Sequence, residues 1–117
     1  MAESEMWQVE VERLIKEAAG NSARVDFFYP EVWNETPAVI TYRLAGKKDL
    51  RADDQCYASL VTIYVDIWSR EPALVEDLSA RCKAALEDAD WIYDNFSNDL
   101  FEQGSGWYHR TERYRQD

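Results

Sequence analysis

The sequence predicts an α+β domain with a mostly antiparallel sheet of about four to five strands and two helices packed on one face. Three observations favour this fold. Two segments carry apolar residues at helical spacing, one long run between them is rich in β-branched and aromatic residues, and shorter alternating segments are bounded by Gly and Pro. The length of 117 residues suits one domain over residues 1–117, and a 46% hydrophobic content is enough for a core.

The first segment, residues 4–20, reads as an amphipathic helix. Ser4 is placed to cap its start, and Gly20-Asn21 suits its end. Its apolar residues recur at helical spacing: Trp7, Val11, Leu14, Ile15 and Ala18.

Two strands are expected before the centre of the chain. Residues 25–29 form a short aromatic strand that Pro30 ends, and a loop over residues 31–36 follows. Residues 37–45 alternate between two faces, as a strand with one buried face does. We expect a turn at residues 46–49, before a loosely specified stretch over residues 50–55.

Residues 56–68 give the strongest strand signal of the chain. One face is apolar: Val61, Ile63, Val65 and Ile67. The other face is mixed: Leu60, Thr62, Tyr64, Asp66 and Trp68. With both helices on one side of the sheet, the opposite side is expected to expose Tyr64, Trp68 and Val39, which would make it an interaction surface.

A second helix and three extended segments complete the chain. Ser69 is expected to cap the helix, with Pro72 in its first turn. Its apolar stripe is Val75, Leu78, Cys82, Ala85 and Leu86. Residues 91–96 and 99–102 read as short extended pieces, and a turn at residues 104–106 leads into a last strand over residues 107–115.

The charge of the chain is strongly negative and unevenly spread. Thirteen Lys and Arg face 23 Asp and Glu, a formal net charge of −10, which opposes tight binding to phosphate backbones. Residues 87–102 hold six acids and no Lys or Arg: Glu87, Asp88, Asp90, Asp94, Asp99 and Glu102. Arg110, Arg113 and Arg115 follow near the end. No apolar run is long enough to span a membrane.

No catalytic, cofactor-binding or metal-binding constellation stands out, so we do not expect an enzyme. His109 is the only histidine, and any Ser-His-Asp triad would have to use it. Asp94, Asp99 and Glu102 could gather a Ca²⁺ or Mg²⁺ ion, but their spacing is not that of an EF-hand, and a solvated acidic face is the competing interpretation. Cys56 and Cys82 lack CxxC spacing, and we expect two reduced, buried thiols.

The five tryptophans are many for a core of this size. Trp7 fits the core beside the first helix, whereas Trp33 and Trp68 are the main candidates for a protein–protein interface. Trp91 and Trp107 are weaker candidates. The alternative is that two or three of these rings cover sheet edges within one chain.

The whole chain resembles the tail terminator (tail completion) proteins of long-tailed bacteriophages and related prophages. The segments that carry the resemblance keep the same element order: Tyr29-Pro30, residues 37–42, Ser59, Val65-Asp66-Ile67-Trp68-Ser69, Leu74 and Leu78, Gly106-Trp107-Tyr108-His109-Arg110, and Arg113-Tyr114. The match is diffuse, and the Val-Asp-Ile-Trp strand followed by a helix is its most suggestive part. Trp107 departs from it, because a smaller aliphatic residue would be unremarkable there.

The resemblance implies a structural virion protein without catalytic residues or cofactors. It would form a homo-oligomeric ring, a hexamer, at the head-proximal end of the tail, after synthesis in the cytoplasm of the host bacterium. The ring would end tail-tube polymerisation and dock the head. Its partners would be further copies of itself, the tail tube protein and a head-closure or connector protein. DNA would only pass through it, with no specific nucleic-acid binding and no membrane contact.

Within such a ring, the residues suggest two kinds of surface. The candidate subunit interface is Trp33, Tyr64, Trp68, Arg110 and Arg113. The candidate lumen-facing acids are Asp94, Asp99 and Glu102, because a DNA passage should lack Lys and Arg. These acids could instead solvate an outer surface, or pair with Arg110, Arg113 or Arg115 of a neighbouring subunit.

Three alternatives remain open at this point. The chain could be a head-closure or connector protein of the same joint. It could be a small acidic, inhibitor-like binding module that acts as a monomer on a basic partner. It could be an enzyme at a subunit interface, which would require carboxylates such as Asp66 and Asp94 to meet across chains.

Overall fold

The computed structural model describes residues 6–27, 36–52 and 55–116. Within these ranges, residues 48–59 are described by their backbone alone. The elements follow in the order α1 (Met6–Ala19), β1 (Arg24–Phe27), β2 (Ala38–Ala52), β3 (Gln55–Ser69), α2 (Pro72–Asp88), β4 (Ile92–Glu102) and β5 (Trp107–Gln116). The five strands form one sheet in the order β1-β2-β3-β5-β4. Only β1 runs parallel to its neighbour, so the predicted α+β fold with a mostly antiparallel sheet is confirmed.

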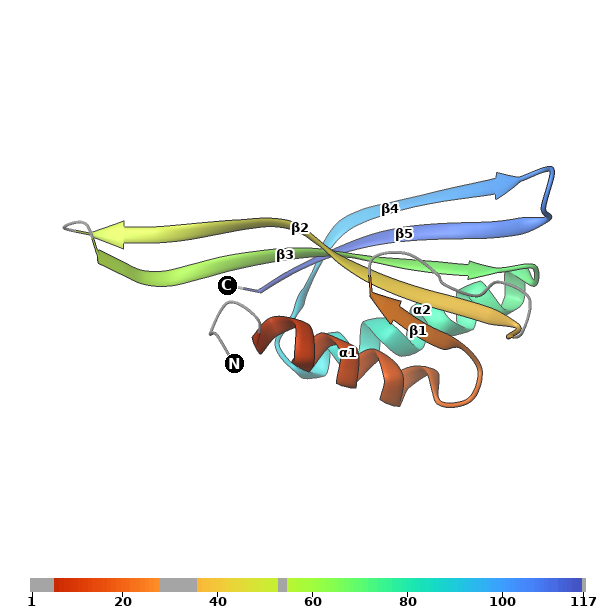
Figure 1. Cartoon of the computed structure of the whole chain (residues 1–117), viewed down its shortest axis with the longest axis horizontal. Helices are drawn as coiled ribbons and strands as arrows, with labels where there is room; N and C mark the ends of the chain where they lie inside the picture. Colours follow the sequence, from red (N-terminus) through yellow and green to blue (C-terminus); the bar gives the residue numbers. More distant parts are fainter. Residues whose placement is uncertain (1–5, 28–35, 53–54, 117) are drawn as a thin grey trace.

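Both helices lie on the same face of the sheet, and the core fills the space between the two layers (Figure 1). The predicted apolar face of β3 forms the floor of this core, because Val61, Ile63, Val65 and Ile67 are all buried. The stripe of α2 is also buried, apart from the half-buried Ala85. The helices contribute further apolar side chains to the core: Val11, Leu14 and Ile15 from α1, and Leu78, Cys82 and Leu86 from α2. No helix in the described ranges is long and apolar enough to cross a membrane.

The hairpin of β2 and β3 is longer than the body that supports it. β3 pairs with β5 only from Val61 to Ser69, while its pairing with β2 continues to Gln55. We call this overhang the β2–β3 arm: residues 46–52 are its β2 limb and residues 55–60 its β3 limb. The arm projects past the start of α1, and the molecule measures 53 × 25 × 25 Å (Figure 1).

The turn expected at residues 46–49 is therefore wrong. Lys47, Lys48 and Asp49 stay in the strand and pair with Val61, Leu60 and Ser59. A register shift between Leu44 and Gly46 absorbs the local irregularity, so the ladder continues through residues that favour turns on their own. The chain reverses instead between Ala52 and Gln55, which pair with each other.

Other boundaries also shift. The N-cap of α2 is Glu71 rather than Ser69. Ser69 lies two residues earlier, where its hydroxyl donates to the carbonyl of Pro37 over 2.8 Å and accepts from the backbone N–H of Glu71 over 3.0 Å. Pro72 opens the helix as expected. The two extended pieces after α2 form one strand, β4, with an irregularity around Asn95 at a φ of 51°. Gly20 ends α1 with a φ of 56°, whereas the predicted cap Ser4 lies outside the described residues.

Trp91 and Trp107 are buried within the chain, with 1% and 4% of their surface exposed. The indole nitrogen of Trp91 donates to Glu10 of α1 over 3.2 Å, and Arg70 lies over the ring of Trp107. For these two residues the interface interpretation is wrong, because their rings complete the packing of the monomer.

Cys82 lies inside the core, where burial raises the pKa of its thiol to about 12. A Cys56→Ser variant, which retains Cys82 as its only cysteine, should therefore react with a thiol reagent at pH 8 only after unfolding. The labelling rate should rise with urea in step with the loss of helical signal. Rapid labelling of the native variant would contradict the burial of Cys82.

Candidate interaction surfaces

The sheet face without helices centres on a buried carboxylate, Asp66 of β3. Its side chain is 3% exposed, and three neighbouring groups bind it. The Nε2 atom of His109 lies 2.8 Å from its Oδ1 atom, and the hydroxyl of Thr111 donates to the same oxygen over 2.6 Å. Arg43 of β2 donates to Oδ2 over 3.2 Å. Asp66 thus connects the two strands that flank β3.

These contacts decide the charge of Asp66. Burial raises the pKa of this carboxyl group, but the hydrogen bonds from His109 and Thr111 and the nearby charges of His109 and Arg43 outweigh burial. Its pKa therefore lies below the usual range. An aspartate that stays ionised and fully bonded is a structural anchor for this face of the sheet.

Aromatic rings lie on both sides of this anchor. Trp68 stacks on His109, with ring centroids 3.4 Å apart and an interplanar angle of 11°. Arg43 lies over the ring of Tyr64, 4.3 Å from its centroid. Trp68 and Tyr64 are both half-buried, so each keeps part of its ring available to a partner. Trp33, the third aromatic interface candidate, lies outside the described residues.

Val39, expected on the exposed side of this face, is fully buried at 0% exposure. It sits opposite Trp68 in the pairing of β2 with β3, and the next residue on the same face, Thr41, accepts a hydrogen bond from the Trp68 indole over 3.4 Å. The exposed part of this face is therefore smaller than the alternation of the sequence suggests.

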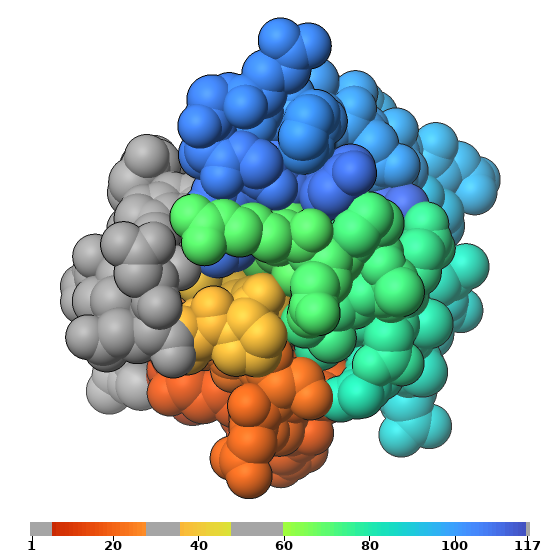
Figure 2. All heavy atoms as spheres, turned by 90° about the vertical axis from the view of Figure 1, so that its right-hand side faces the viewer, coloured from red at the N-terminus to blue at the C-terminus, as the bar shows by residue number. Residues whose placement is uncertain are grey.

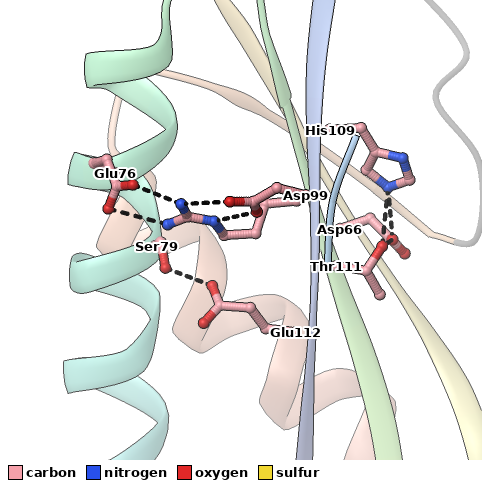
Figure 3. A network of polar contacts seen from close by, with 8 residues as sticks. Asp66, Glu76, Ser79, Asp99, His109, Thr111 and Glu112 are labelled. Carbon is pink, nitrogen blue, oxygen red and sulfur yellow. Dashed lines mark hydrogen bonds and ion pairs between the residues drawn. The ribbon is translucent and has the colours of Figure 1, made fainter. Parts of the chain in front are cut away.

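Arg110 and Arg113 find acidic partners within their own chain. Arg110 binds Asp99 of β4 through Nε over 2.7 Å, and its two terminal nitrogens bind Glu76 of α2 (Figure 3). Arg113 donates to Asp94 of β4 over 2.6 Å. The carboxylates of Glu76 and Asp99 raise the pKa of Arg110 further, and Arg110 lowers that of Asp99. Asp94 and Asp99 thus pair with arginines of their own chain.

The three candidate lumen acids all lie on β4, one of the two edge strands of the sheet in the described residues. Asp94 is half-buried against Arg113, with 30% of its side chain exposed, whereas Asp99 is 63% exposed. Glu102 is exposed next to the β4–β5 turn and accepts a hydrogen bond from Ser105 over 3.1 Å. The structure therefore gathers them along one edge. In the described part of the chain, no group of three or more His, Cys, Asp or Glu is arranged to hold a metal ion.

A second buried carboxylate, Glu112, was not singled out from the sequence. It lies on the helix side of β5, where the hydroxyl of Ser79 donates to it from α2, on the opposite side of β5 from Asp66 (Figure 3). Burial raises the pKa of Glu112. Alternation along residues 107–115 places Glu112 on the same face as Tyr114 and Arg110. This alternation is the sequence feature that could have indicated that Glu112 faces the helices.

A groove of about 440 Å³ separates the start of α2 from the β4–β5 hairpin. Its lining is mostly apolar and includes Val75, Phe101 and Tyr108, while Glu76 and Asp99 form a polar end. Leu100 and Phe101 are 55% and 51% exposed. Figure 2 views this end of the molecule, with the β4–β5 turn in blue above the end of β3 and the start of α2 in green.

Comparison with known proteins relates this fold to a virus-like particle. The chain is similar to a chain of the solved structure described as "Virion of native gene transfer agent (GTA) particle", with a TM-score of 0.63 and 9% sequence identity. The similarity covers 92% of this chain and 90% of that chain. No protein-family model matches the sequence, and no curated protein does. At this identity, the comparison shows that the two chains share a fold.

Asp66→Asn should destabilise the protein in a pH-dependent way. The variant loses the ionic part of three contacts, and we expect the free energy of unfolding to fall by about 2 kcal/mol at pH 7. Because folding lowers the pKa of Asp66, its contribution is complete above the unfolded pKa of about 3.9 and is lost as the pH falls through the folded value. Urea unfolding at pH 7 and pH 3 measures both effects.

Asp77→Asn is the matched control, since Asp77 is an aspartate half-exposed on α2 and paired with Arg81. It should change the unfolding free energy by less than about 0.5 kcal/mol. A cost for Asp66→Asn that is equally small, or that is the same at pH 3 as at pH 7, would contradict the role of Asp66 as an ionised anchor.

Proposed function

We propose that this protein is a structural component of a phage-like virion that assembles as a ring at the head-proximal end of the tail. There it would end polymerisation of the tail tube and offer the surface on which the head docks. Further copies of the chain, the tail tube protein and a head-closure or connector protein would be its partners. The virion, at the head–tail joint, would be its location.

The observation that carries this proposal is the shared fold with a chain of the gene transfer agent particle, over nearly the full length of both chains. A gene transfer agent particle is described as a virion, so the solved neighbour belongs to an assembled particle. The resemblance to tail terminators does not depend on this comparison. It favours a position at the end of the tail.

The shape and surface of the chain support assembly. The sheet has exposed apolar side chains at one end and a two-stranded arm at the other, and both are surfaces that a partner can cover. The net charge of −10 favours a passage that does not retain DNA, because phosphates bind where Lys and Arg neutralise them. Glu102, exposed at the end of β4, is the acid proposed to face that passage.

A connector protein of the same joint is the second candidate, and the same fold similarity supports it. An acidic module that binds a basic partner as a monomer is the candidate from another class. Its support is the charge alone, and part of that charge is neutralised within the chain by Arg110 and Arg113.

Light scattering over a range of protein concentrations separates these classes. A ring protein should show masses that are multiples of 13.7 kDa, whereas an inhibitor-like module should remain at one chain. Mild amine cross-linking before the measurement preserves weak rings. A mass that stays at one chain at every concentration, with and without cross-linker, would overturn the proposed ring.

Trp68→Ala should weaken assembly more than it weakens the fold. A half-buried tryptophan at an interface commonly contributes about 2 kcal/mol or more, which corresponds to roughly a thirtyfold weaker association. Sedimentation measures association, and urea unfolding of the same samples measures the fold. Trp91→Phe is the control, because Trp91 is buried in the monomer and its change should affect unfolding alone. If Trp68→Ala assembles as the original protein does, Trp68 is not an interface residue.

A further inference from the structure

Two ends of the molecule have strand edges without a partner in the described residues. At one end, the β3 limb of the β2–β3 arm pairs with β2 on one side and has no described neighbour on the other, because β5 begins its pairing at Val61. At the other end, β4 pairs with β5 on one side and is the last strand of the sheet. Open strand edges bind further strands readily, so soluble proteins usually cover them.

The two edges match in length and regularity. Ser97–Glu102 of β4 pairs with β5 residue by residue after the irregularity at Asn95, so this part is a regular six-residue edge. The β3 limb, residues 55–60, offers the same number of residues in extended form. Its sequence (Gln-Cys-Tyr-Ala-Ser-Leu) carries no charge, so pairing would bury no unpaired ion.

The surroundings of each edge are complementary. The groove beside β4 is mostly apolar, with Leu100 and Phe101 exposed next to it. At its polar end Glu76 and Asp99 face one arginine, Arg110, which leaves a net charge of −1. The β2 limb carries Lys47, Lys48 and Arg51 against Asp49, a net charge of +2 (3 − 1).

The positions of the two edges determine what kind of contact they can make between copies of the chain. The arm and the β4–β5 turn lie at opposite ends of the 53 Å axis, so the edges of one copy cannot meet each other (Figure 1). Two different surfaces that bind each other between copies make a head-to-tail contact, and such contacts close into rings when the rotation allows.

We propose that the β3 limb of one copy adds to the outer edge of Ser97–Glu102 in the next copy and extends its sheet by one strand, beside the groove between β4 and α2. In strand addition, main-chain hydrogen bonds supply affinity, and pockets for alternate side chains supply specificity. This proposal rests on the proposed ring and names the contact that would build it.

Cys56 belongs to the β3 limb and can serve as a probe; its side chain is not among those described, so its expected burial stays a prediction that this experiment also tests. We would introduce a second cysteine at Ser97, Asn98 or Leu100, one at a time, and oxidise the protein mildly. Addition of the limb to β4 brings Cys56 of one copy beside β4 of the next, within the roughly 7 Å between Cα atoms that a disulfide spans. At least one variant should give a ladder of dimers, trimers and larger species on non-reducing gels.

A Glu17→Cys variant is the control, since Glu17 is exposed on α1, away from both edges, and it should give no ladder. Dimers without larger species would overturn the head-to-tail contact, because a symmetric pair uses both cysteines at once. No cross-linking above the control at any of the three positions would overturn the proposal.

A second experiment uses two variants, each of which removes one side of the proposed contact. An armless variant replaces residues 48–60 with Asn-Gly between the paired residues Lys47 and Val61, as a two-residue hairpin turn requires. An edge variant carries Leu100→Lys and Phe101→Lys. Each alone should associate at least about tenfold more weakly than the original chain. A mixture should form a dimer of one chain of each kind and nothing larger, because only one intact contact remains.

Met6→Lys with Val9→Lys is the matched control, since both residues are exposed apolar side chains on α1, at 60% and 51%, and it should associate normally. Thermal unfolding of each variant verifies its fold. If the original chain associates and the armless and edge variants do so equally well, this contact is wrong and the proposed ring stands. If the original chain remains a monomer throughout, both are wrong.

Discussion

Val61–Ser69 of β3 is the part of the chain on which the remainder depends, because it is paired along both edges and has buried residues on both faces. Its apolar face lies under the two helices. The other face is held by Asp66 instead of by apolar packing. Residues of β2 and β5 bind both oxygens of this carboxylate. Burying a charge is costly unless it is paired and hydrogen-bonded, so this arrangement holds the three central strands in one register.

The elongated shape follows from that register. β2 continues past the end of β5 toward one side, and β4 with β5 reaches toward the other, while the helices leave the arm uncovered (Figure 1). The arm and the open strand edges are therefore surfaces that another chain can contact, as is the sheet face that carries Trp68. Structural proteins that assemble by such edges gain main-chain hydrogen bonds from each contact, which makes assembly tolerant of side-chain change.

Charge acts differently in the folded chain than its distribution along the sequence suggests. The acids of β4 lie close to arginines of β5, and α2 adds Glu76 to the same network. Surface ion pairs of this kind contribute little to stability, but they orient the edge strand against the helix and reduce the local charge at the groove. The excess of acids elsewhere keeps the net charge of the chain negative, which opposes binding to phosphate backbones.

The sequence by itself determined the element order, both helices and the apolar face of β3, because periodicities of 3.6 and 2 are local properties of the chain. It also determined the burial of Cys82, which follows from the helical stripe. Only the tertiary structure decided that residues 46–49 extend a strand, that Trp91 and Trp107 complete the monomer, and that Arg110 and Arg113 bind acids of their own chain. Each of these depends on a partner distant in sequence, such as residues 59–61 for the arm or Glu10 for Trp91. Local preference for a turn is weaker than a continuing ladder of backbone hydrogen bonds, and no spacing along the chain reveals which distant segment supplies it.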